Sequence, residues 1–415
     1  MGAVNKTILV LSGGKEAIEG IRIAKGMDLK VIVCDGDRNA PGRALADEFL
    51  HANIYDPGAV ESALAKYRGK RKINGVITIA SDAVRAVAAA AEYLGLPGIS
   101  KETAFLATEK LEMKKRFKAA SVPGPHFAEI GSKKKLRRQI CIFGQAVLKP
   151  VDSRGARGVL RVDENTDIDW AFDYSMNFSQ SGKLILEEWF PGPQISTESL
   201  VVDGKSYLCG VADRNYSRLD ETFPHVVEDG GETPSRYSPA IDRKLTKLLD
   251  RAAQSLDIRN GVIKGDIVLR DGEPNIIEVA ARLSGGFFST FTIPLVYKIN
   301  IVEQAILLAL GEKIMPPLIL KAHCHQANRF LFVGPGTVKK VAFPSQDSLP
   351  RFVKYFEVNV SEGDVISRLE NHTMRRGSVL VIGKSREQSV ERAERMVRSI
   401  KVEINCKSGG RSECR

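Results

Sequence analysis

The stretch GVIKGDIVLRDGEPNIIEVAARLSGG, residues 261–286, contains two apolar strand-like segments joined by the polar turn Asp271-Gly272-Glu273. A hairpin with this three-residue turn would place Asp266 directly opposite Glu278 on the same face. Two adjacent acids in a half-buried sheet repel each other and lose hydration, so the pair requires a compensating cation. Mg²⁺ binds carboxylates together with substrate phosphates, and the hairpin therefore predicts a magnesium site. A register slip of one residue would separate the two acids.

A second candidate site lies upstream, in VLKPVDSRGARGVL, residues 147–160. An apolar strand signal leads into Lys149, and a glycine loop with two arginines follows from Ser153 to Gly158. Because glycine has no Cβ, such a loop can bring backbone N–H groups close to phosphate oxygens. The lysine and the loop together favour a polyanionic ligand, and a nucleotide triphosphate is the first candidate.

Weaker signals flank this loop. The helical pattern of residues 108–120 carries Lys110 at its start, and the connector SVPGPHF follows at residues 121–127. The stretch KLILEEWFPGPQIS, residues 183–196, combines a strand with paired acids, an aromatic residue and a proline-glycine break. Each signal alone has an ordinary structural explanation, because lysines on helices and glutamates at strand edges usually face solvent.

The first third of the chain alternates apolar strand-like runs with helical patterns, which predicts βαβ units around a parallel sheet. The strand-like runs are residues 7–14, 29–37 and 75–82, and the helical patterns are residues 16–25 and 84–95. A dinucleotide-binding enzyme is an alternative, because Asp35 ends the second run where a ribose-binding acid would lie. The turn Ser12–Ala17 reads SGGKEA, however, and lacks the G-x-G-x-x-G spacing of such enzymes. The sequence therefore disfavours a nicotinamide or flavin dehydrogenase.

The whole chain has 415 residues, of which 43% are hydrophobic and 27% charged, and this predicts a globular protein of two or three domains. A formal charge of +11 would suit nucleic acid, an anionic membrane or a phosphorylated ligand. The basic runs 133–135 and 137–138 lack interleaved aromatics, so they are typical of a solvated face and not of a nucleic-acid interface. The sequence also shows no signal-like N-terminus and no apolar stretch long enough to span a bilayer.

Six cysteines are scattered along the chain without a CxxC pair, so neither a disulfide framework nor a zinc ribbon is expected. A reducing cytoplasm is the natural location for such a chain. His323-Cys324-His325 could present both imidazoles on one face of a strand, but no further metal ligands are evident nearby. A partly buried strand is the simpler interpretation of this tripeptide.

The C-terminal part carries no catalytic signal of its own. FLFVG (330–334) and SVLVIG (378–383) are strand-like, and residues 388–400 have a helical pattern. The final KSGGRSECR is typical of a disordered tail.

Taken in order along about nine tenths of the chain, these motifs resemble the ATP-grasp superfamily, in particular its biotin-carboxylase-like and L-amino-acid-ligase-like members. The resemblance implies an architecture of mixed α/β and α+β type, with the ATP-grasp fold at its centre. It implies a Rossmann-like parallel-sheet domain before the ATP-grasp domain and a small closing domain after it. The corresponding ranges are 1–105, 106–312 and 313–405, with a tail at 406–415.

The resemblance also implies roles for individual residues. Asp266 and Glu278 correspond to the magnesium ligands, which would also accept Mn²⁺, and Arg282 corresponds to the arginine that faces the reacting phosphate or the substrate carboxylate. Lys110 and Lys149 correspond to the two nucleotide-binding lysines, and Lys149 and Arg282 together form the implied catalytic pair. The loop over the phosphates corresponds to Ser153, Arg154, Gly155, Arg157 and Gly158. The adenine hinge and ribose position correspond to Glu187, Glu188, Trp189, Phe190 and Gln194.

The chain departs from the family pattern at three of these positions. Ala280 replaces an asparagine found in many members, so the metal site would rest on two carboxylates plus phosphate oxygens. Gln194 stands where relatives often have a glutamate, and its amide can still accept and donate hydrogen bonds. Asp266 is shorter than the commoner glutamate and would shift the ion slightly.

The function implied is that of an ADP-forming carboxylate-amine ligase that uses ATP and Mg²⁺ and acts through an acylphosphate. An amino acid is a candidate for one of its substrates. An ATP-dependent carboxylase, another phosphoryl-transfer enzyme of the same fold and a non-catalytic ATP-binding regulator remain alternatives. The expected partners are a small carboxylate and a small amine, with no nucleic acid and no membrane, and a homodimer is left open.

Overall fold

The computed structural model describes residues 6–67, 69 and 71–405, and these residues form two compact units. The first unit contains the residues up to 127 together with 190–213 and 234–323, and the second contains 128–189, 214–233 and the residues from 324. Each unit therefore combines segments that are distant in the sequence. The tail expected at 406–415, with Cys406 and Cys414, lies outside the described residues. The division into consecutive sequence domains stays a prediction.

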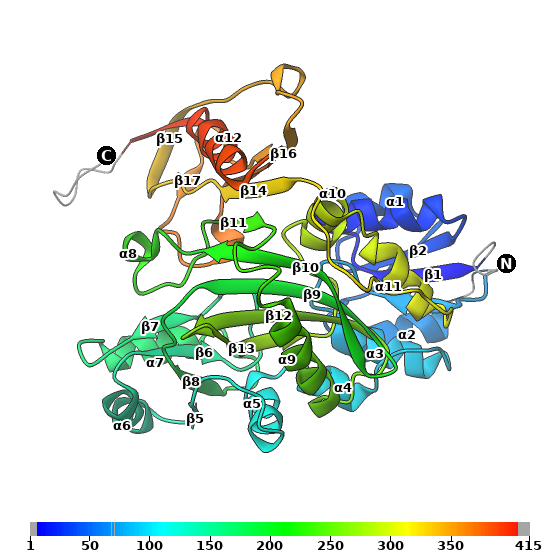
Figure 1. Ribbon diagram of the computed structural model, residues 1–415, viewed down its shortest axis with the longest axis horizontal. Helices are drawn as coiled ribbons and strands as arrows, with labels where there is room; N and C mark the ends of the chain where they lie inside the picture. The colour runs from blue at the N-terminus through cyan, green and yellow to red at the C-terminus, as the bar shows by residue number, and fades with distance from the viewer. Residues whose placement is uncertain (1–5, 68, 70, 406–415) are drawn as a thin grey trace. The chain divides into compact units, whose positions relative to one another are not determined.

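A four-stranded parallel sheet forms the N-terminal part of the first unit, which confirms the βαβ prediction (Figure 1). Strand β1 is buried along its whole length and β2 at its centre, which explains their continuous apolar runs. The helix expected from Glu16 begins with a short 3-10 turn, Lys15–Ala17, before α1. The strand order is β3 (Glu48–His51), β2 (Lys30–Asp35), β1 (Thr7–Leu11) and β4 (Gly75–Ile77), with helices α1 (Ile18–Gly26), α2 (Pro57–Lys66) and α3 (Val84–Tyr93) between strands or after them.

The acid at the end of β2 has a structural contact that accounts for its position. The Asp35 carboxylate accepts hydrogen bonds from the backbone N–H of Gly13, at 2.7 Å, and of Asp37, at 2.9 Å. Asp35 therefore fixes the turn that follows β1.

An antiparallel sheet forms the second layer of the first unit, and helix α9 (Asp242–Ser255) packs on its hairpin (Figure 1). Leucines 245, 248 and 249 of α9 share one buried core with isoleucines 263, 267 and 276 of the hairpin. This amphipathic packing buries one face of the sheet and leaves the other face for polar side chains. The strands lie in the order β13 (Glu273–Ala280), β12 (Gly261–Arg270), β9 (Gln194–Val202) and β10 (Lys205–Asn215), of which β10 belongs to this unit up to Asp213.

Three further helices of the first unit begin at capping residues that the sequence supplies. The Ser100 hydroxyl accepts from Thr103 N–H, the Glu109 carboxylate from Glu112 N–H, and the Asn300 side chain from Glu303 N–H. These caps start α4 (Lys101–Leu106), α5 (Lys110–Ala119) and α11 (Ile301–Ala309), and α10 (Ile293–Tyr297) precedes α11.

The second unit begins with a four-stranded sheet whose two helices share its apolar core. Helix α6 (Lys133–Phe143) buries Leu136 and Ile140, while its basic residues 134, 135, 137 and 138 are exposed. The prediction of a solvated basic face is therefore confirmed for these four residues, whereas Lys133 is half-buried and pairs with Asp169 and Asp173. The strand order is β5 (Phe127–Ile130), β8 (Leu184–Glu188), β6 (Ala146–Pro150) and β7 (Leu160–Val162), and the second helix is α7 (Ile168–Met176).

A further antiparallel layer of the second unit carries helix α12 (Arg386–Arg398), which packs on β14 and β18 (Figure 1). The Ser385 hydroxyl caps this helix by accepting from Gln388 N–H at 3.2 Å. The strands of this unit's layer are β11 (Gly230–Thr233), β14 (His325–Phe330), β18 (Gly377–Gly383) and β16 (Val353–Val358). A smaller sheet contains β17 (Val365–Ile366), β15 (Gly336–Ala342) and β19 (Lys401–Asn405), and the short α8 is Leu219–Thr222.

The C-terminal expectations are confirmed in part. SVLVIG lies in β18, but FLFVG does not form a strand beyond Phe330, where β14 ends. The final helix lies two residues earlier than expected, and the strand β19 that follows it was not predicted. Of His323-Cys324-His325 only His325 lies in a strand, so the partly buried strand expected for this tripeptide is found at His325 alone. No group of three or more His, Cys, Asp or Glu side chains suited to a metal ion occurs among the described residues.

No helix within the described ranges has the length and apolar character needed to cross a bilayer.

Candidate active site

The hairpin pairs the two acids as the sequence predicted, although its turn is shorter. Asp266 lies opposite Glu278 in the antiparallel register of β12 and β13. The expected three-residue turn is wrong, because the strands end at Arg270 and Glu273 and leave a two-residue turn. The turn residues Asp271 and Gly272 have positive φ angles of 53° and 77°, as expected of a tight Asp-Gly hairpin turn.

A β-bulge restores the register that the shorter turn would have changed. From the turn, the ladder pairs Ile267 with Ile276, and a regular continuation would place Asp266 opposite Ile277. The register shifts between Asp266 and Ile267, so Ile277 is the extra residue and Glu278 takes the place opposite Asp266. The two acids share a face because of this bulge.

The connector before β5 supports the bulged strand from its outer side. The backbone N–H of Ile276 donates to the carbonyl of Pro123 at 2.8 Å, and the Lys114 ammonium donates to the carbonyl of Ile276 at 3.3 Å. A Cβ on Gly124 would lie only 2.6 Å from the Ile276 carbonyl oxygen. The close approach of the connector therefore requires glycine at position 124.

Two lysines compensate the acid pair. Lys264 forms an ion pair with Asp266, and the Lys110 ammonium lies 3.4 Å from a carboxylate oxygen of Glu278. Lys110 is the first residue of α5 and only 8% exposed. Lys264 was not among the predicted site residues, although its position two residues before Asp266 on the same strand placed it on the same face.

The donor set fits a magnesium ion. Asp266 and Glu278 offer hard carboxylate oxygens on one face, and a magnesium site typically takes one or two carboxylates and completes its shell with phosphate oxygens and water. No third His, Cys, Asp or Glu side chain joins them as a metal-binding group within the described ranges.

Arg282 follows the same strand and forms an ion pair with Asp82. Its Nε and Nη2 atoms lie 2.8 Å and 2.7 Å from one carboxylate oxygen of Asp82, and Nη1 donates to the Leu283 carbonyl at 3.0 Å. Burial alone would lower the pKa of Arg282, but the attraction of Asp82 and the hydrogen bond to it, with Glu198 and Asp266, raise that pKa. The sequence assigned no role to Asp82, which holds the guanidinium in place.

A fully buried glutamate fixes the segment that follows Arg282. Glu198 of β9 accepts from the Ser284 N–H at 2.9 Å and from the Ser289 hydroxyl at 2.7 Å. Burial raises the pKa of the Glu198 carboxyl, and these hydrogen bonds only partly oppose that shift. The next turn is held by Glu16, whose carboxylate accepts from the Gly286 N–H at 2.7 Å.

In the second unit, Lys149 of β6 and Glu187 of β8 form a buried ion pair. The Lys149 ammonium lies 2.8 Å from a Glu187 carboxylate oxygen, and the residues are 5% and 2% exposed. The pair arises because β6 and β8 are antiparallel neighbours with Val147 opposite Glu187. Two residues that the sequence assigned separately, one to phosphate and one to the adenine hinge, are thus in direct contact.

The glycine loop after Lys149 contains two glycines in the left-handed backbone region. Gly155 and Gly158 have positive φ angles of 64° and 71°, and Gly158 packs so closely that a Cβ would lie 2.9 Å from Pro150. The Gly155 carbonyl accepts from the His372 N–H at 3.1 Å. The neighbouring arginines contact each other, because Arg157 Nε donates to the Arg154 carbonyl at 3.1 Å. Ser153 is half-buried at the start of the loop.

The predicted hinge residues are divided between the units. Glu187 and Glu188 end β8, and the ring of Trp189 lies 4.8 Å from the Arg161 guanidinium, all within the second unit. Phe190, under the guanidinium of Arg270 at 4.5 Å, belongs to the first unit. So does Gln194, which begins β9 opposite Val268.

The structure thus brings together two groups of candidates, each within one unit. The roles assigned to their members in binding and catalysis stay predictions. The first unit holds Lys110, Asp266, Glu278, Arg282, Phe190 and Gln194, and the second holds Lys149, Ser153, Arg154, Gly155, Arg157, Gly158, Glu187, Glu188 and Trp189.

Three known protein families match parts of the chain. Residues 22–98 match the ATP-grasp N-terminal domain, residues 107–286 match the ATP-grasp domain, and residues 329–405 match the L-amino acid ligase C-terminal domain 2. The chain belongs to the ATP-grasp superfamily.

Several known proteins are similar to this chain at low sequence identity. The crystal structure of an L-amino acid ligase from Bacillus licheniformis aligns with a TM-score of 0.80 and 20% identity, over 97% of this chain and 100% of that one. Carnosine synthase 1 from Gallus gallus is 25% identical over 33% of this chain and 14% of its own length. A formate-dependent phosphoribosylglycinamide formyltransferase from Synechococcus sp. (strain CC9311) is 25% identical over 44% of this chain and 48% of its own length. The matches thus span about half or less of these curated relatives.

The fold is therefore the ATP-grasp fold, with its parallel N-terminal sheet, central antiparallel sheets and C-terminal domain. This ATP-grasp enzyme has an L-amino acid ligase-like C-terminal region, and its family uses ATP with Mg²⁺.

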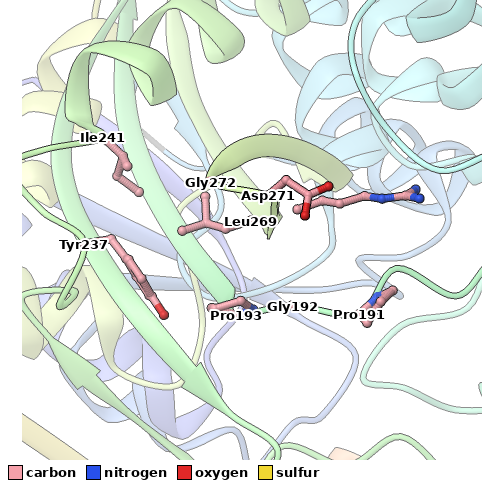
Figure 2. Close-up of a pocket in the computed structure, with 9 residues that line it drawn as sticks. Pro191, Gly192, Pro193, Tyr237, Ile241, Leu269, Asp271 and Gly272 are labelled. Atoms are coloured by element: carbon pink, nitrogen blue, oxygen red, sulfur yellow. The ribbon is translucent and has the colours of Figure 1, made fainter.

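One pocket of this ATP-grasp chain lies at the turn end of the hairpin, within the first unit (Figure 2). It has a volume of about 580 Å³. None of the candidate site residues lines this pocket, so it does not indicate where a nucleotide binds. Its walls are residues 191–193, Tyr237, Ile241 and 269–272.

Proposed function

We propose that the chain is an ATP-dependent ligase that joins a carboxylate to an amine and releases ADP and phosphate, with an amino acid as one substrate. The observation that carries the proposal is the acid pair Asp266 and Glu278, which shares one face and is flanked by Lys110 and Arg282. The L-amino acid ligase C-terminal domain at residues 329–405 supports the choice of a carbon-nitrogen ligase.

The proposed chemistry has two steps. A carboxylate oxygen of the first substrate attacks the γ-phosphorus of ATP, the bond to the β-phosphate oxygen breaks, and ADP leaves. The amine then attacks the acyl carbon of the acylphosphate, expels inorganic phosphate and loses a proton. Neither step requires a covalent enzyme nucleophile. Burial raises the pKa of the thiols of Cys34 and Cys209 to about 12, so these two cysteines are not thiolates at neutral pH.

The residues of the chain bind and orient in this scheme. Lys149 and the loop from Ser153 to Gly158 hold phosphate oxygens, and Asp266 with Glu278 would hold Mg²⁺. The bound ion would neutralise charge on the phosphate oxygens during transfer. In this scheme the Arg282 guanidinium leaves Asp82 and pairs with the reacting anionic group. One ion pair thus replaces another.

Hydroxylamine trapping tests the proposal. The enzyme is incubated with ATP, Mg²⁺ and a panel of carboxylic acids, with hydroxylamine in place of the amine. An acid-dependent hydroxamate with one ADP per product is expected. AMP and pyrophosphate would overturn the acylphosphate mechanism, bicarbonate-dependent turnover would indicate a carboxylase, and ATP binding without phosphate release across the panel would indicate a regulator.

The proposed location is the cytoplasm, and the proposed partners are small molecules. The location is supported by the scattered cysteines, because Cys34, Cys141 and Cys209 are free thiols.

A further inference from the structure

Arg375 of the second unit has a buried hydrogen-bonding edge that nothing in the described part of the chain fills. It lies between a short 3-10 turn, His372–Met374, and β18. Its Nε and Nη2 atoms are both buried and have no hydrogen-bond acceptor among the described residues. Burying a charged donor without an acceptor is costly, and such groups are rare in native structures outside functional sites.

The geometry of these two atoms is informative. Nε–H and one N–H of Nη2 point in parallel from the same edge of the planar guanidinium. This edge is the fork that binds both oxygens of a carboxylate or phosphate. The Arg375 side chain is 13% exposed, although its Nε and Nη2 atoms are themselves buried.

The nearest acid is already engaged by another arginine. Glu228 Oε2 lies 3.8 Å from Arg375 Nη2, which is too far for a hydrogen bond. The same oxygen accepts from Nε and Nη2 of Arg214 at 3.2 Å and 2.8 Å. Two guanidinium groups therefore share one carboxylate. The Phe330 ring supports the Arg375 guanidinium from one face, with Cζ 3.7 Å from the ring centroid.

A neighbouring cluster shows how this unit satisfies its structural arginines. Glu232 is 4% exposed, and its two carboxylate oxygens accept from Asn215, at 2.7 Å, and from Arg386, at 2.6 Å. Arg329 Nη1 lies 2.7 Å from the first of these oxygens. The arginines around Glu232 thus have close acidic partners, whereas Arg375 leaves its fork open.

We propose that the Nε and Nη2 edge of Arg375 binds an oxyanion, namely the carboxylate of the amine substrate. This inference rests on the proposed ligase function and names the chemical class of its acceptor, an amine that carries a carboxylate. Arg214 contributes the excess positive charge, and the Phe330 ring holds the planar guanidinium in place from one face.

The subsite is connected to the glycine loop by two hydrogen bonds of the same unit. The Glu228 N–H donates to His372 Nε2 at 3.3 Å, and the His372 N–H donates to the Gly155 carbonyl at 3.1 Å. The segment that holds the anion therefore also contacts the loop assigned to the ATP phosphates. This link favours a substrate subsite over a remote effector site.

A binding experiment on the whole enzyme tests the subsite without turnover. Acetate is the probe, acetamide is the neutral control of the same shape, and chloride matches the ionic strength. Acetate should raise the melting temperature of the wild type in a saturable way, acetamide should not, and Arg375→Met should lose the effect. Persistence of the acetate effect in Arg375→Met would overturn the proposal, as would protection by inorganic phosphate but not by acetate.

Stability without a ligand gives a second readout. Arg375→Met removes an unsatisfied charge and keeps an apolar stem on Phe330, so it should melt no lower than the wild type. The matched control Arg386→Met removes a paired arginine from Glu232 and should melt lower. A larger loss in Arg375→Met than in Arg386→Met would mean that Arg375 is a structural residue and would overturn the proposal.

Turnover separates this inference from the proposed function. With a substrate pair that releases ADP, an amino acid used as the amine should have a KM about 10- to 100-fold below that of its amide, and Arg375→Met should abolish that preference. An unchanged preference would overturn the subsite but not the ligase. If no pair releases ADP, the ligase proposal fails, and the acetate experiment still decides whether Arg375 binds an oxyanion.

Discussion

Replacing Glu198 by glutamine should stabilise the first unit at neutral pH, against the usual result for a buried polar substitution. The wild-type carboxylate is fully buried and is held by the Ser284 N–H and the Ser289 hydroxyl. Glutamine can keep this network. Its carbonyl accepts from Ser284, its NH₂ group donates to Ser289, and the Ser289 hydroxyl turns to the Ser284 carbonyl, which lies 3.1 Å away.

Proton linkage gives the sign and the size of the expected change in the free energy of unfolding. Burial raises the pKa of the Glu198 carboxyl above its ordinary value of 4.5, so over the pH range between the unfolded and the folded pKa the folded chain binds more protons than the unfolded chain. The stability that depends on this proton is fully present below the unfolded pKa and decreases as the pH rises through the folded pKa. One proton changes the free energy of unfolding by at most about 1.4 kcal/mol per pH unit. Glu198→Gln should remove this slope.

Urea unfolding at pH 5, 6, 7 and 8, followed by far-ultraviolet circular dichroism, measures the difference between variant and wild type. Tryptophan fluorescence, from Trp170 and Trp189 of the second unit, follows the same unfolding with a second probe. An equal or steeper loss of stability with rising pH in the variant would refute the reasoning.

Glu232→Gln is the matched variant with the opposite expectation. Glu232 is also buried, but it pairs with two arginines, so its loss leaves buried positive charge uncompensated. The expected cost is about 3 to 5 kcal/mol, and tryptophan fluorescence should detect it because the cluster lies in the second unit.

Two further substitutions test the candidate site. Glu278→Gln removes one proposed magnesium ligand and the ion pair between Glu278 and Lys110. The rate of ADP release should therefore fall at least about 100-fold, while the circular dichroism spectrum stays unchanged. Substantial turnover in this variant would argue against the metal pair. Lys149→Met should raise the Kd for ATP about 10- to 100-fold, whereas Lys133→Met on the solvated face of α6 should change it less than about twofold. Equal effects of the two lysine variants, measured by titration calorimetry on samples of verified fold, would contradict the assignment of Lys149.

The local patterns predicted most of the fold because they reflect burial. β1 and β2 are continuous apolar runs because they are central strands covered on both faces, and α3 lies between its predicted bounds. β19 was missed because its alternation is short and follows directly after an amphipathic helix. The two units could not be anticipated either, because each is assembled from segments that only tertiary contacts bring together.

The candidate site was predictable where chemistry and strand periodicity coincide, as they do at Asp266 and Glu278. The turn was one residue shorter than expected, and the bulge at Ile277 compensated for it, so the correct pairing followed from an incorrect local geometry. Asp82 and Glu198 were missed for another reason. Their importance comes from contacts with residues 200 and 86 positions away, which no local pattern records.

The connector at Pro123 and Gly124 also bears on the behaviour of the protein at high concentration. β13 ends its sheet, and an exposed edge strand offers unpaired backbone groups to strands of other molecules. On that edge the Pro123 carbonyl accepts a hydrogen bond from the Ile276 N–H, and the Gly124 backbone lies directly against the Ile276 carbonyl. A side chain at position 124 would push this cover away. The small residue in the connector thus protects the hairpin that carries the acid pair from intermolecular strand pairing and aggregation.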